Sequence, residues 1–299
     1  MNPGRRRALR VLAGTGAATA AAAAPVGAAR TADPVSPEAV GMLYDTTKCI
    51  GCKACVSACQ KANDLEPDRS PDGLHQAPLS LSSRTKNVIK LFKDDQQISY
   101  FKAQCMHCVD PACSAACMLG SLHKDEITGI VSYDPSYCVG CRYCQMACPF
   151  NVPKFEFEKA APKIVKCEMC RHLLAQGGIP ACCEVCPREA VIYGKRADLL
   201  AEARRRLEEN PDAYVPKVYG ETEAGGTQVL YLSHVEFEKL GLPEFGDEGI
   251  PHVAYTIQEA IYKGFIAPVA LYGARGLVML RNRKNQGGPG EADSGKEES

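Results

Sequence analysis

Cysteines are the residues of this sequence that can do chemistry, and they occur in four groups. The chain has 299 residues and 17 cysteines, all of them between Cys49 and Cys186. Sixteen of them form four groups of four, and Cys183 is the one left over. Clustered thiolates bind metal ions or metal clusters, or else they form disulfides. The four quartets are Cys49, Cys52, Cys55 and Cys59; Cys105, Cys108, Cys113 and Cys117; Cys138, Cys141, Cys144 and Cys148; and Cys167, Cys170, Cys182 and Cys186.

The spacing within the quartets favours [4Fe-4S] clusters. The third quartet fits the run C-x2-C-x2-C-x3-C-P found in bacterial ferredoxins, and the first fits it except for Gln60 in place of the proline. A cubane has four irons, and each iron needs one thiolate. Three closely spaced cysteines reach three irons from one loop, while the fourth lies one helical turn away and faces a neighbouring cluster. The repeated run therefore predicts paired clusters.

Zinc sites and disulfides explain this spacing less well. Zinc knuckles use two distant C-x2-C pairs with four ligands in total, so they leave half of each quartet without a role. Disulfides within C-x2-C-x2-C require strained loops. Small disulfide scaffolds are also usually shorter than about 100 residues. A structural zinc-cluster protein remains the competing class of function.

The fourth quartet leaves one choice open. A C-x3-C-P ending selects Cys182 and Cys186 as ligands, with Cys183 as a small buried apolar residue. Alternatively, Cys183 replaces Cys182, which gives C-x2-C-P.

Histidines and basic residues beside the quartets are expected to be secondary. Sixteen thiolate positions are already filled, so we expect the histidines not to act as ligands. The basic neighbours can raise reduction potentials by offsetting cluster charge, but most are expected to be solvated. The residues concerned are His107, His123 and His172, and Lys48, Lys53, Arg142 and Lys166.

Charge excludes nucleic acid as a partner, and the N-terminus predicts export. Basic and acidic residues both number 35, so no basic excess is present. Residues 1–33 contain consecutive arginines, Arg5 to Arg7, and an apolar stretch, Val11 to Ala24, too short to span a bilayer. They resemble a twin-arginine signal. That route carries folded proteins, so a metal cofactor can be inserted before export.

Between and after the quartets, the pattern predicts short strands and one amphipathic helix. Residues 60–87 are expected to form an insertion loop, and Asn87 to Phe101 a hairpin. The helix is expected over Ala197 to Glu209 and is stopped by Asn210 and Pro211. Further strands are expected at Met42 to Asp45, Gly129 to Asp134, Ala190 to Gly194 and Gln228 to Ser233.

The C-terminal region predicts a helix that could serve as an anchor. Gly264 to Leu280 is apolar except for Arg275 and is about 25 Å long as a helix. Basic residues follow it directly, which fits a cytoplasmic end. We expect a transmembrane anchor over 256–284, with a buried amphipathic helix as the alternative. The tail, 285–299, is expected to be disordered.

Several stretches resemble the four-cluster iron–sulfur subunits of membrane-bound respiratory oxidoreductases, and the hydrogenase members in particular. The resemblance implies an α+β fold of two fused bacterial-ferredoxin-like modules with insertions, plus a C-terminal helix. It divides the chain into the signal at 1–33, a four-cluster domain at 34–196, a partner-docking extension at 197–255, the anchor and the tail. The stretches are Gln104 to Pro111, Cys141 to Lys154, Gly178 to Pro187, Tyr219 to Leu230 and Tyr262 to Gly264.

The resemblance also implies which cysteines share a cluster. The first quartet pairs with the fourth and the second with the third, and each cluster takes three cysteines from one run and one from the partner run. Four [4Fe-4S] clusters are therefore expected. Their ligand sets are Cys49, Cys52, Cys55 and Cys186; Cys59, Cys167, Cys170 and Cys182; Cys105, Cys108, Cys113 and Cys148; and Cys117, Cys138, Cys141 and Cys144. Met118, where the family usually has proline, is a local departure.

The function implied is electron transfer without catalysis. The expected partners are the small and large subunits of a [NiFe] hydrogenase and an integral membrane quinone-interacting subunit, at the periplasmic face of the cytoplasmic membrane. The alternative is the iron–sulfur subunit of a molybdopterin oxidoreductase such as formate dehydrogenase.

Overall fold

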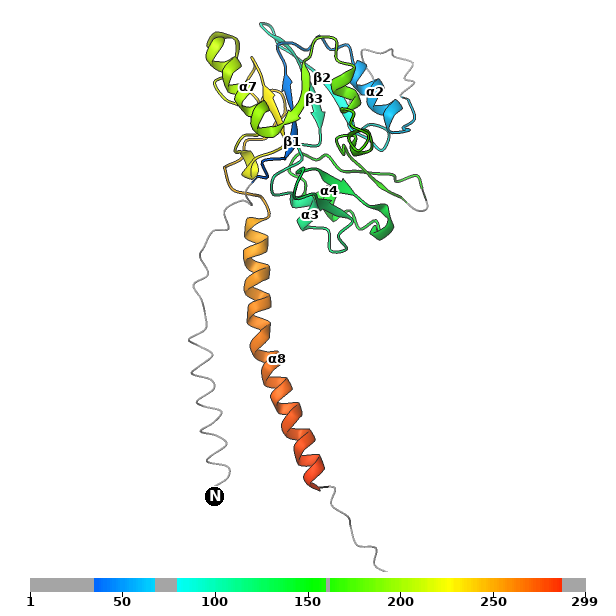
Figure 1. The fold of residues 1–299 in the computed structure, drawn as a ribbon, viewed down its shortest axis with the longest axis vertical. Coiled ribbons are helices and arrows are strands. Elements are labelled where there is room, and N and C mark those ends of the chain that lie inside the picture. Colours follow the sequence, from blue (N-terminus) through cyan, green and yellow to red (C-terminus); the bar gives the residue numbers. More distant parts are fainter. Residues whose placement is uncertain (1–34, 68–79, 160–161, 287–299) are drawn as a thin grey trace, which may run out of the picture. The chain divides into compact units, whose positions relative to one another are not determined.

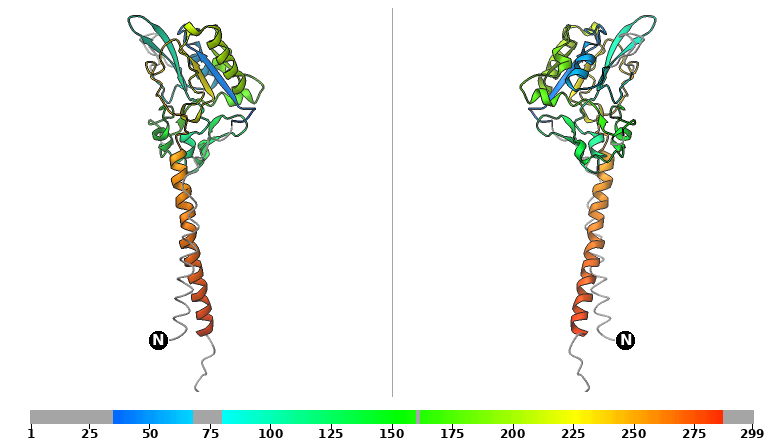
Figure 2. Two further views of the ribbon diagram at one scale, coloured as in Figure 1. Left: turned by 90° about the vertical axis from the view of Figure 1, so that its left-hand side faces the viewer. Right: turned by 90° about the vertical axis from the view of Figure 1, so that its right-hand side faces the viewer.

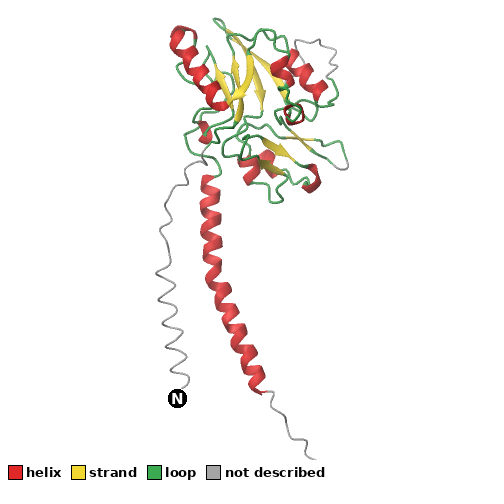
Figure 3. Cartoon of the chain, in the orientation of Figure 1, coloured by secondary structure: helices red, strands yellow, loops and turns green. Residues whose placement is uncertain are grey.

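The computed structural model describes residues 35–67, 80–159 and 162–286 (Figure 1). The fold is of mixed α+β type, with short helices and strands between the cysteine runs (Figure 3). The described residues up to His252 form one compact unit, and the helix that follows belongs to a second. The twin-arginine signal expected at 1–33 and the tail expected from residue 287 onward lie outside the described residues.

A three-stranded sheet lies beside the first and fourth cysteine quartets. Strand β1 (Val40–Asp45) lies in the middle, antiparallel to β8 (Val191–Lys195) and parallel to β9 (Val229–Leu232). β1 precedes the first quartet and β8 follows the fourth, so their pairing joins the two ends of the cysteine-bearing segment. The strands expected at these three places are confirmed.

The faces of this sheet are specified by side-chain alternation along the strands. Leu43 and Leu230 point to one side and pack against helix α7 (Arg196–Glu209). Met42, Tyr44 and Tyr231 point to the other side, into the core that contains cysteines. The apolar stripe of α7 therefore covers the face of the sheet opposite the candidate site, and the expected helix is confirmed.

The hairpin predicted from the alternating apolar residues is present. Strands β2 (Asn87–Lys93) and β3 (Ile98–Gln104) pair antiparallel, from Asn87 with Gln104 to Lys93 with Ile98. The turn is closed by Asp94, whose carboxylate accepts bonds from the backbone N–H groups of Gln96 and Gln97. Figure 2 shows the turn end of the hairpin extending away from the rest of its unit.

Short helices follow the cysteine runs and pack in nested pairs. Helix α2 (Ala54–Ala62), in the first quartet, packs against α6 (Ala181–Glu184), in the fourth. Helix α3 (Ala112–Ala115), in the second, packs against α4 (Tyr143–Ala147), in the third. The remaining elements are β4 (Leu122–Lys124) paired with β5 (Val131–Tyr133), β6 (Lys154–Phe155) paired with β7 (Ile164–Val165), α5 (Arg171–Leu174), and the 3-10 turns η1 (Pro135–Tyr137), η2 (Pro211–Ala213) and η3 (Glu223–Gly225).

One expectation about the connections needs correction, and one segment has a structural role besides the partner docking expected of it. The insertion loop expected at 60–87 begins later, because α2 continues to Ala62. The segment after α7 contributes β9 to the central sheet and bonds to the second quartet, through Val109 N–H to Gly226 O at 2.9 Å. It is therefore part of the structure that positions the cysteines.

Helix α8 (His252–Gln286) covers the range 256–284 in which an anchor is expected. It runs through Pro268 without ending. The described apolar side chains between Phe265 and Leu280 are exposed. Over the residues that the structure describes, no helix is both long enough and apolar enough to cross a membrane.

Candidate functional site

The four quartets share one backbone conformation. In each, the residue directly before the second cysteine has a left-handed φ: Gly51 at 70°, His107 at 48°, Gly140 at 71° and Met169 at 51°. Glycine adopts this region without strain, whereas other residues are held there by their surroundings. The repeated turn bends each C-x2-C loop around a common centre.

These loops aim backbone N–H groups at cysteine sulfurs. Gly51 N is 3.4 Å from Cys49 Sγ, and Met169 N is 3.4 Å from Cys167 Sγ. The last cysteines of two runs receive similar bonds, from Val152 N to Cys148 Sγ at 3.5 Å and from Ala190 N to Cys186 Sγ at 3.3 Å. Donors of this kind stabilise negative charge on a metal-bound sulfur.

All seventeen cysteines are free thiols, which argues against a disulfide framework. We name four sets of thiols by their predicted sharing of clusters. Site A is Cys49, Cys52, Cys55 and Cys186; site B is Cys59, Cys167, Cys170 and Cys182; site C is Cys105, Cys108, Cys113 and Cys148; site D is Cys117, Cys138, Cys141 and Cys144.

The thiols of site A face a common pocket. All four cysteines line it, together with Tyr44 and Pro187. Burial raises the pKa of Cys49, and the nearby Cys186 and Cys52 thiols raise it further, while the Tyr44 hydroxyl lowers it through a hydrogen bond. A concave space lined by four thiols from two distant runs is a suitable cradle for a cubane.

Site B brings together thiols from the first and fourth quartets. Burial raises the pKa of Cys59 to about 12, with Cys182 and Cys170 as its thiol neighbours. Burial also raises the pKa of Cys167, which has Cys59 and Cys182 beside it. The four cysteines are therefore neighbours in space although up to 123 positions separate them in sequence.

Sites C and D join the second and third quartets in the same way. Burial raises the pKa of Cys108 well above its usual value, and its thiol neighbours Cys105, Cys113 and Cys148 complete site C. At site D, burial raises the pKa of Cys144 to about 11, with further contributions from the other three members. Raised thiol pKa values mean that cluster assembly must displace protons.

The sites follow one another in a line. Sites A and B meet at Cys55 and Cys182, whose charges influence each other. Sites B and C meet where Cys105 neighbours Cys167. Sites C and D meet where Cys144 neighbours Cys113. Cys52 in site A and Cys141 in site D are the exposed members of the seventeen, so the two end sites carry the most exposed thiols.

Cys182 and Cys183 differ in the way that a ligand and a spare thiol should. Cys182 is buried and neighbours the other thiols of site B, whereas Cys183 is only partly buried. A hydrogen bond from Cys183 lowers the pKa of Cys182, and the charge of the nearby Lys102 acts in the same direction. The same contact raises the pKa of Cys183. The geometry favours Cys182 for site B.

Three buried lysines lie close to these thiols, and one of them, Lys53, lines the site A pocket at 8% exposure. Lys102, on β3, is 0% exposed and bonds to the side chains of Gln104 and Cys182. Lys166 is 2% exposed and bonds to the carbonyl oxygens of Val131 and Cys167. The expectation of solvated basic neighbours is wrong for Lys53 and Lys166, which are both buried, and Lys102 was not among the expected neighbours. No sequence signal marks Lys102, because strand lysines are normally exposed.

The histidines make other bonds. His107 is fully buried, and its Nδ1 accepts a bond from Val131 N–H at 3.0 Å. Burial holds its pKa well below the usual value, so the ring is neutral. His123 bonds to Ser132 Oγ at 2.9 Å, and His172 is exposed. In the described ranges, no group of three or more His, Cys, Asp or Glu is arranged to hold a single metal ion.

The four sets of thiols at sites A to D suit [4Fe-4S] clusters, both in their number of ligands and in their surroundings. Each set offers four thiols, as a cubane requires, in a largely buried setting with N–H groups directed at several sulfurs. Bound clusters would supply one-electron redox chemistry. The chain's own role is to hold, space and insulate them.

Comparison with known proteins agrees with this chemistry. Residues 96–196 match a 4Fe-4S dicluster domain and residues 42–61 match a 4Fe-4S binding domain. The chain is 41% identical to the hydrogenase-2 operon protein HybA of Escherichia coli O157:H7, over 84% of this chain and 87% of that protein. It is 32% identical to the iron–sulfur subunit of the nitrate-inducible formate dehydrogenase of Escherichia coli K12, over 78% of this chain and 80% of that one. The chain therefore belongs to the family of ferredoxin-type [4Fe-4S] iron–sulfur electron-transfer subunits that includes HybA.

Proposed function

We propose that this chain conducts electrons through four [4Fe-4S] clusters, one at each of sites A to D, between a [NiFe] hydrogenase and a membrane subunit that reacts with quinone. The observation that carries the proposal is the linear series of four thiol sets with exposed members, Cys52 and Cys141, at its two ends. Electrons enter at one end site and leave at the other. Catalysis takes place on the partner chains.

The nested packing of helices supports the sharing of ligands between runs. Because α2 packs on α6 and α3 on α4, each fourth cysteine lies beside the loop of its partner run. The arrangement corresponds to two ferredoxin-like modules, with the second and third quartets inserted between the first and fourth. Sixteen cysteines serve as ligands, and Cys183 does not.

Hydrogenase is the favoured partner because the hydrogenase-2 operon protein is more similar to this chain than the formate dehydrogenase subunit, at 41% against 32% identity. A molybdopterin oxidoreductase is the second candidate, supported by the formate dehydrogenase relatives. We place the complex at the periplasmic face of the cytoplasmic membrane, reached through the twin-arginine signal expected at 1–33. Membrane attachment through residues 256–284 stays a prediction.

The test is anaerobic purification of the tagged full-length protein from membranes, with identification of the subunits that accompany it. We expect the large and small subunits of a hydrogenase, a membrane subunit, and about 16 irons in this chain. A molybdopterin subunit in their place would favour the second candidate. Zinc in place of iron, or far fewer irons, would refute the four-cluster assignment.

A further inference from the structure

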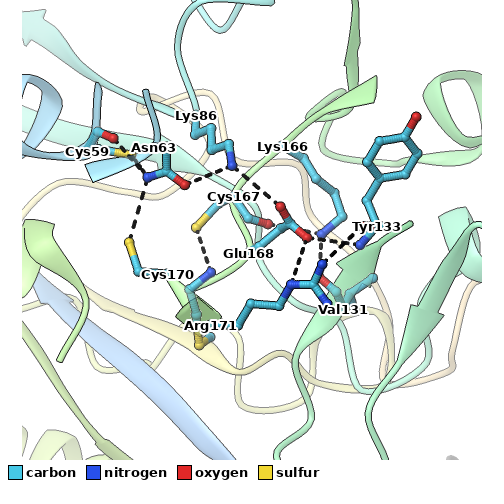
Figure 4. A network of polar contacts seen from close by, with 11 residues as sticks. Cys59, Asn63, Lys86, Val131, Tyr133, Lys166, Cys167, Glu168, Cys170 and Arg171 are labelled. Atoms are coloured by element: carbon cyan, nitrogen blue, oxygen red, sulfur yellow. Dashed lines mark hydrogen bonds and ion pairs between the residues drawn. The ribbon is translucent and has the colours of Figure 1, made fainter. Parts of the chain in front are cut away.

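Asn63 lies at the end of α2 with its side chain directed at two sulfurs of site B (Figure 4). Its Nδ2 is 3.7 Å from Cys59 Sγ and 3.8 Å from Cys170 Sγ. The same nitrogen donates to the carbonyl oxygen of Cys59 at 2.8 Å. Cys59 belongs to the first quartet and Cys170 to the fourth, so one amide group reaches both halves of the site.

Lys86 fixes which end of the amide faces the sulfurs. An asparagine side chain has a donor nitrogen and an acceptor oxygen, and its orientation follows from its partners. Lys86 Nζ is 2.9 Å from Asn63 Oδ1. An ammonium group only donates, so the reverse orientation would set two donors against each other. The N–H groups of Asn63 must therefore point at site B.

Glu168 holds Lys86 in place from within the Cys167–Cys170 loop. Its Oε2 is 3.5 Å from Lys86 Nζ, and both side chains are mostly buried. Its Oε1 accepts a bond from Tyr133 N–H at 3.1 Å and pairs with Arg171 Nε at 3.4 Å. The orientation of Asn63 is thus set by a network that is tied to the loop carrying two ligands of the same site (Figure 4).

We propose that Asn63, oriented by Lys86, raises the reduction potential of the cluster at site B by donating N–H groups to Cys59 and Cys170. The inference rests on the proposed function, since it requires a cluster there. Reduction adds one electron, supplied by the partner subunit, and breaks no bond. The added negative charge spreads onto the sulfurs, where N–H donors stabilise it and so favour the reduced state.

A purely structural role for Asn63 makes a different prediction. The Cys59 carbonyl near the end of α2 accepts bonds from both the backbone N–H and the side-chain amide of Asn63, so the side chain also contributes to the helix cap. If capping were the whole role, replacement would lower thermal stability and leave the reduction potential unchanged. The potential therefore separates the two roles.

The experiment is an EPR-monitored redox titration of the intact complex carrying Asn63→Leu, Asn63→Asp or Lys86→Met. Asn63→Leu should make the reduction equilibrium of one cluster about tenfold less favourable. For one electron, this lowers its midpoint potential by about 59 mV. Asn63→Asp should lower it further, because a carboxylate adds negative charge where a donor was lost. Lys86→Met should lower the same potential, because the amide is then free to turn.

Controls come from the β2–β3 hairpin, where Gln96→Leu and Lys93→Met change exposed side chains of the same types. Both should leave every potential unchanged. Unchanged potentials in the fully loaded Asn63 variants would overturn the inference. So would loss of site B irons in both Asn63 variants, because the residue would then hold the site together instead of setting its potential. The iron content and the number of reduction steps of the wild type test the proposed function separately.

Discussion

At the scale of single residues, the left-handed turn before each second cysteine is a constraint that can be tested at two matched glycines. Gly51 and Gly140 have nearly the same φ, 70° and 71°. A Cβ on Gly51 would lie 2.2 Å from the Tyr100 ring, whereas one on Gly140 would lie 3.4 Å from Phe155. Replacing either glycine with alanine costs backbone strain, but only the replacement at Gly51 also creates a steric clash.

Gly51→Ala should therefore disrupt site A, while Gly140→Ala should be tolerated at site D. Each left-handed alanine costs about 1 kcal/mol, and the clash with Tyr100 adds to this only at Gly51. Iron content and EPR spectra of the purified variants provide the measurement: Gly51→Ala should lose up to one cluster. Equal iron content in the two variants would contradict the argument.

Lys102 provides a second test at the residue scale. Burial alone would lower the pKa of Lys102, but the neighbouring Cys182, Cys55 and Cys167 thiols raise it, so the ammonium stays charged. No carboxylate in the described part of the chain forms an ion pair with it. Metal-bound thiolates of sites A and B are then the anions that balance this charge, as burial of a cation demands.

Lys102→Met should therefore make reduction of two clusters at least about tenfold less favourable. Each of the two reduction potentials should fall by about 59 mV or more. Lys102→Arg keeps the positive charge, so in protein that contains both clusters the two reduction potentials should stay close to those of the wild type. Redox titration of both variants checks this. A shift confined to one cluster would mean that Lys102 serves a single site.

The sequence predicted which cysteines gather at each site better than it predicted the polar side chains around them. Cysteine spacing follows from the geometry of a cubane and is visible along the chain. Lys102 lies far along the chain from Cys182, and Asn63, although only four residues after Cys59, also reaches Cys170 of the fourth quartet. Nothing in the sequence around either residue sets it apart. Their roles appear only once β3 and the end of α2 are placed beside the thiols.

At the scale of elements, helix α7 is joined to the sheet through a buried ion pair. Arg206 Nη1 lies 3.0 Å from Asp45 Oδ2, with the side chains 11% and 0% exposed. Asp45 follows the apolar part of β1 and leads into the first quartet, so this pair connects the helix to the start of site A. Removing Arg206 leaves the buried Asp45 carboxylate with hydrogen bonds from Thr47 and Tyr214 but without its cationic partner.

Arg206→Met should destabilise the docking of α7 by about 3 kcal/mol. Hydrogen exchange of the α7 amides should accelerate accordingly. The matched control is Arg205→Met, because the ion pairs of Arg205 with Glu202 and Glu209 are exposed and should contribute less than about 1 kcal/mol. Similar exchange in the two variants would show that the Asp45 pair does not hold the helix.

Helices and strands with a clear periodic pattern of apolar residues were predicted well, and the shortest helices were not. The β2–β3 hairpin and α7 carry patterns over 14 or more residues, so their periodicity is unambiguous. Helices α3, α5 and α6 have four residues each, too few for any pattern to repeat. They form because the ligand loops bend the backbone there. The strand β9 was predicted, whereas its parallel pairing with β1 was not, because that pairing is a tertiary contact.

At the scale of the whole molecule, the pairing of β1 with β8 determines the order of the sites. It brings the first quartet to the fourth, and the second and third quartets, which lie between them in the sequence, pack together beside that pair. Site C is an interior member of the series that we propose, so we expect electrons passing between sites A and D to cross it.

Cys108→Ala should therefore stop transfer through the complex while leaving most of the clusters in place. We expect about 12 irons in this chain, normal chemical reduction of the remaining clusters, and loss of hydrogen-driven quinone reduction. Cys183→Ala, which changes a thiol outside the four sites, should leave both iron content and transfer intact. Quinone reduction that persists in Cys108→Ala would mean that electrons bypass site C, and a branched path would then replace the linear one.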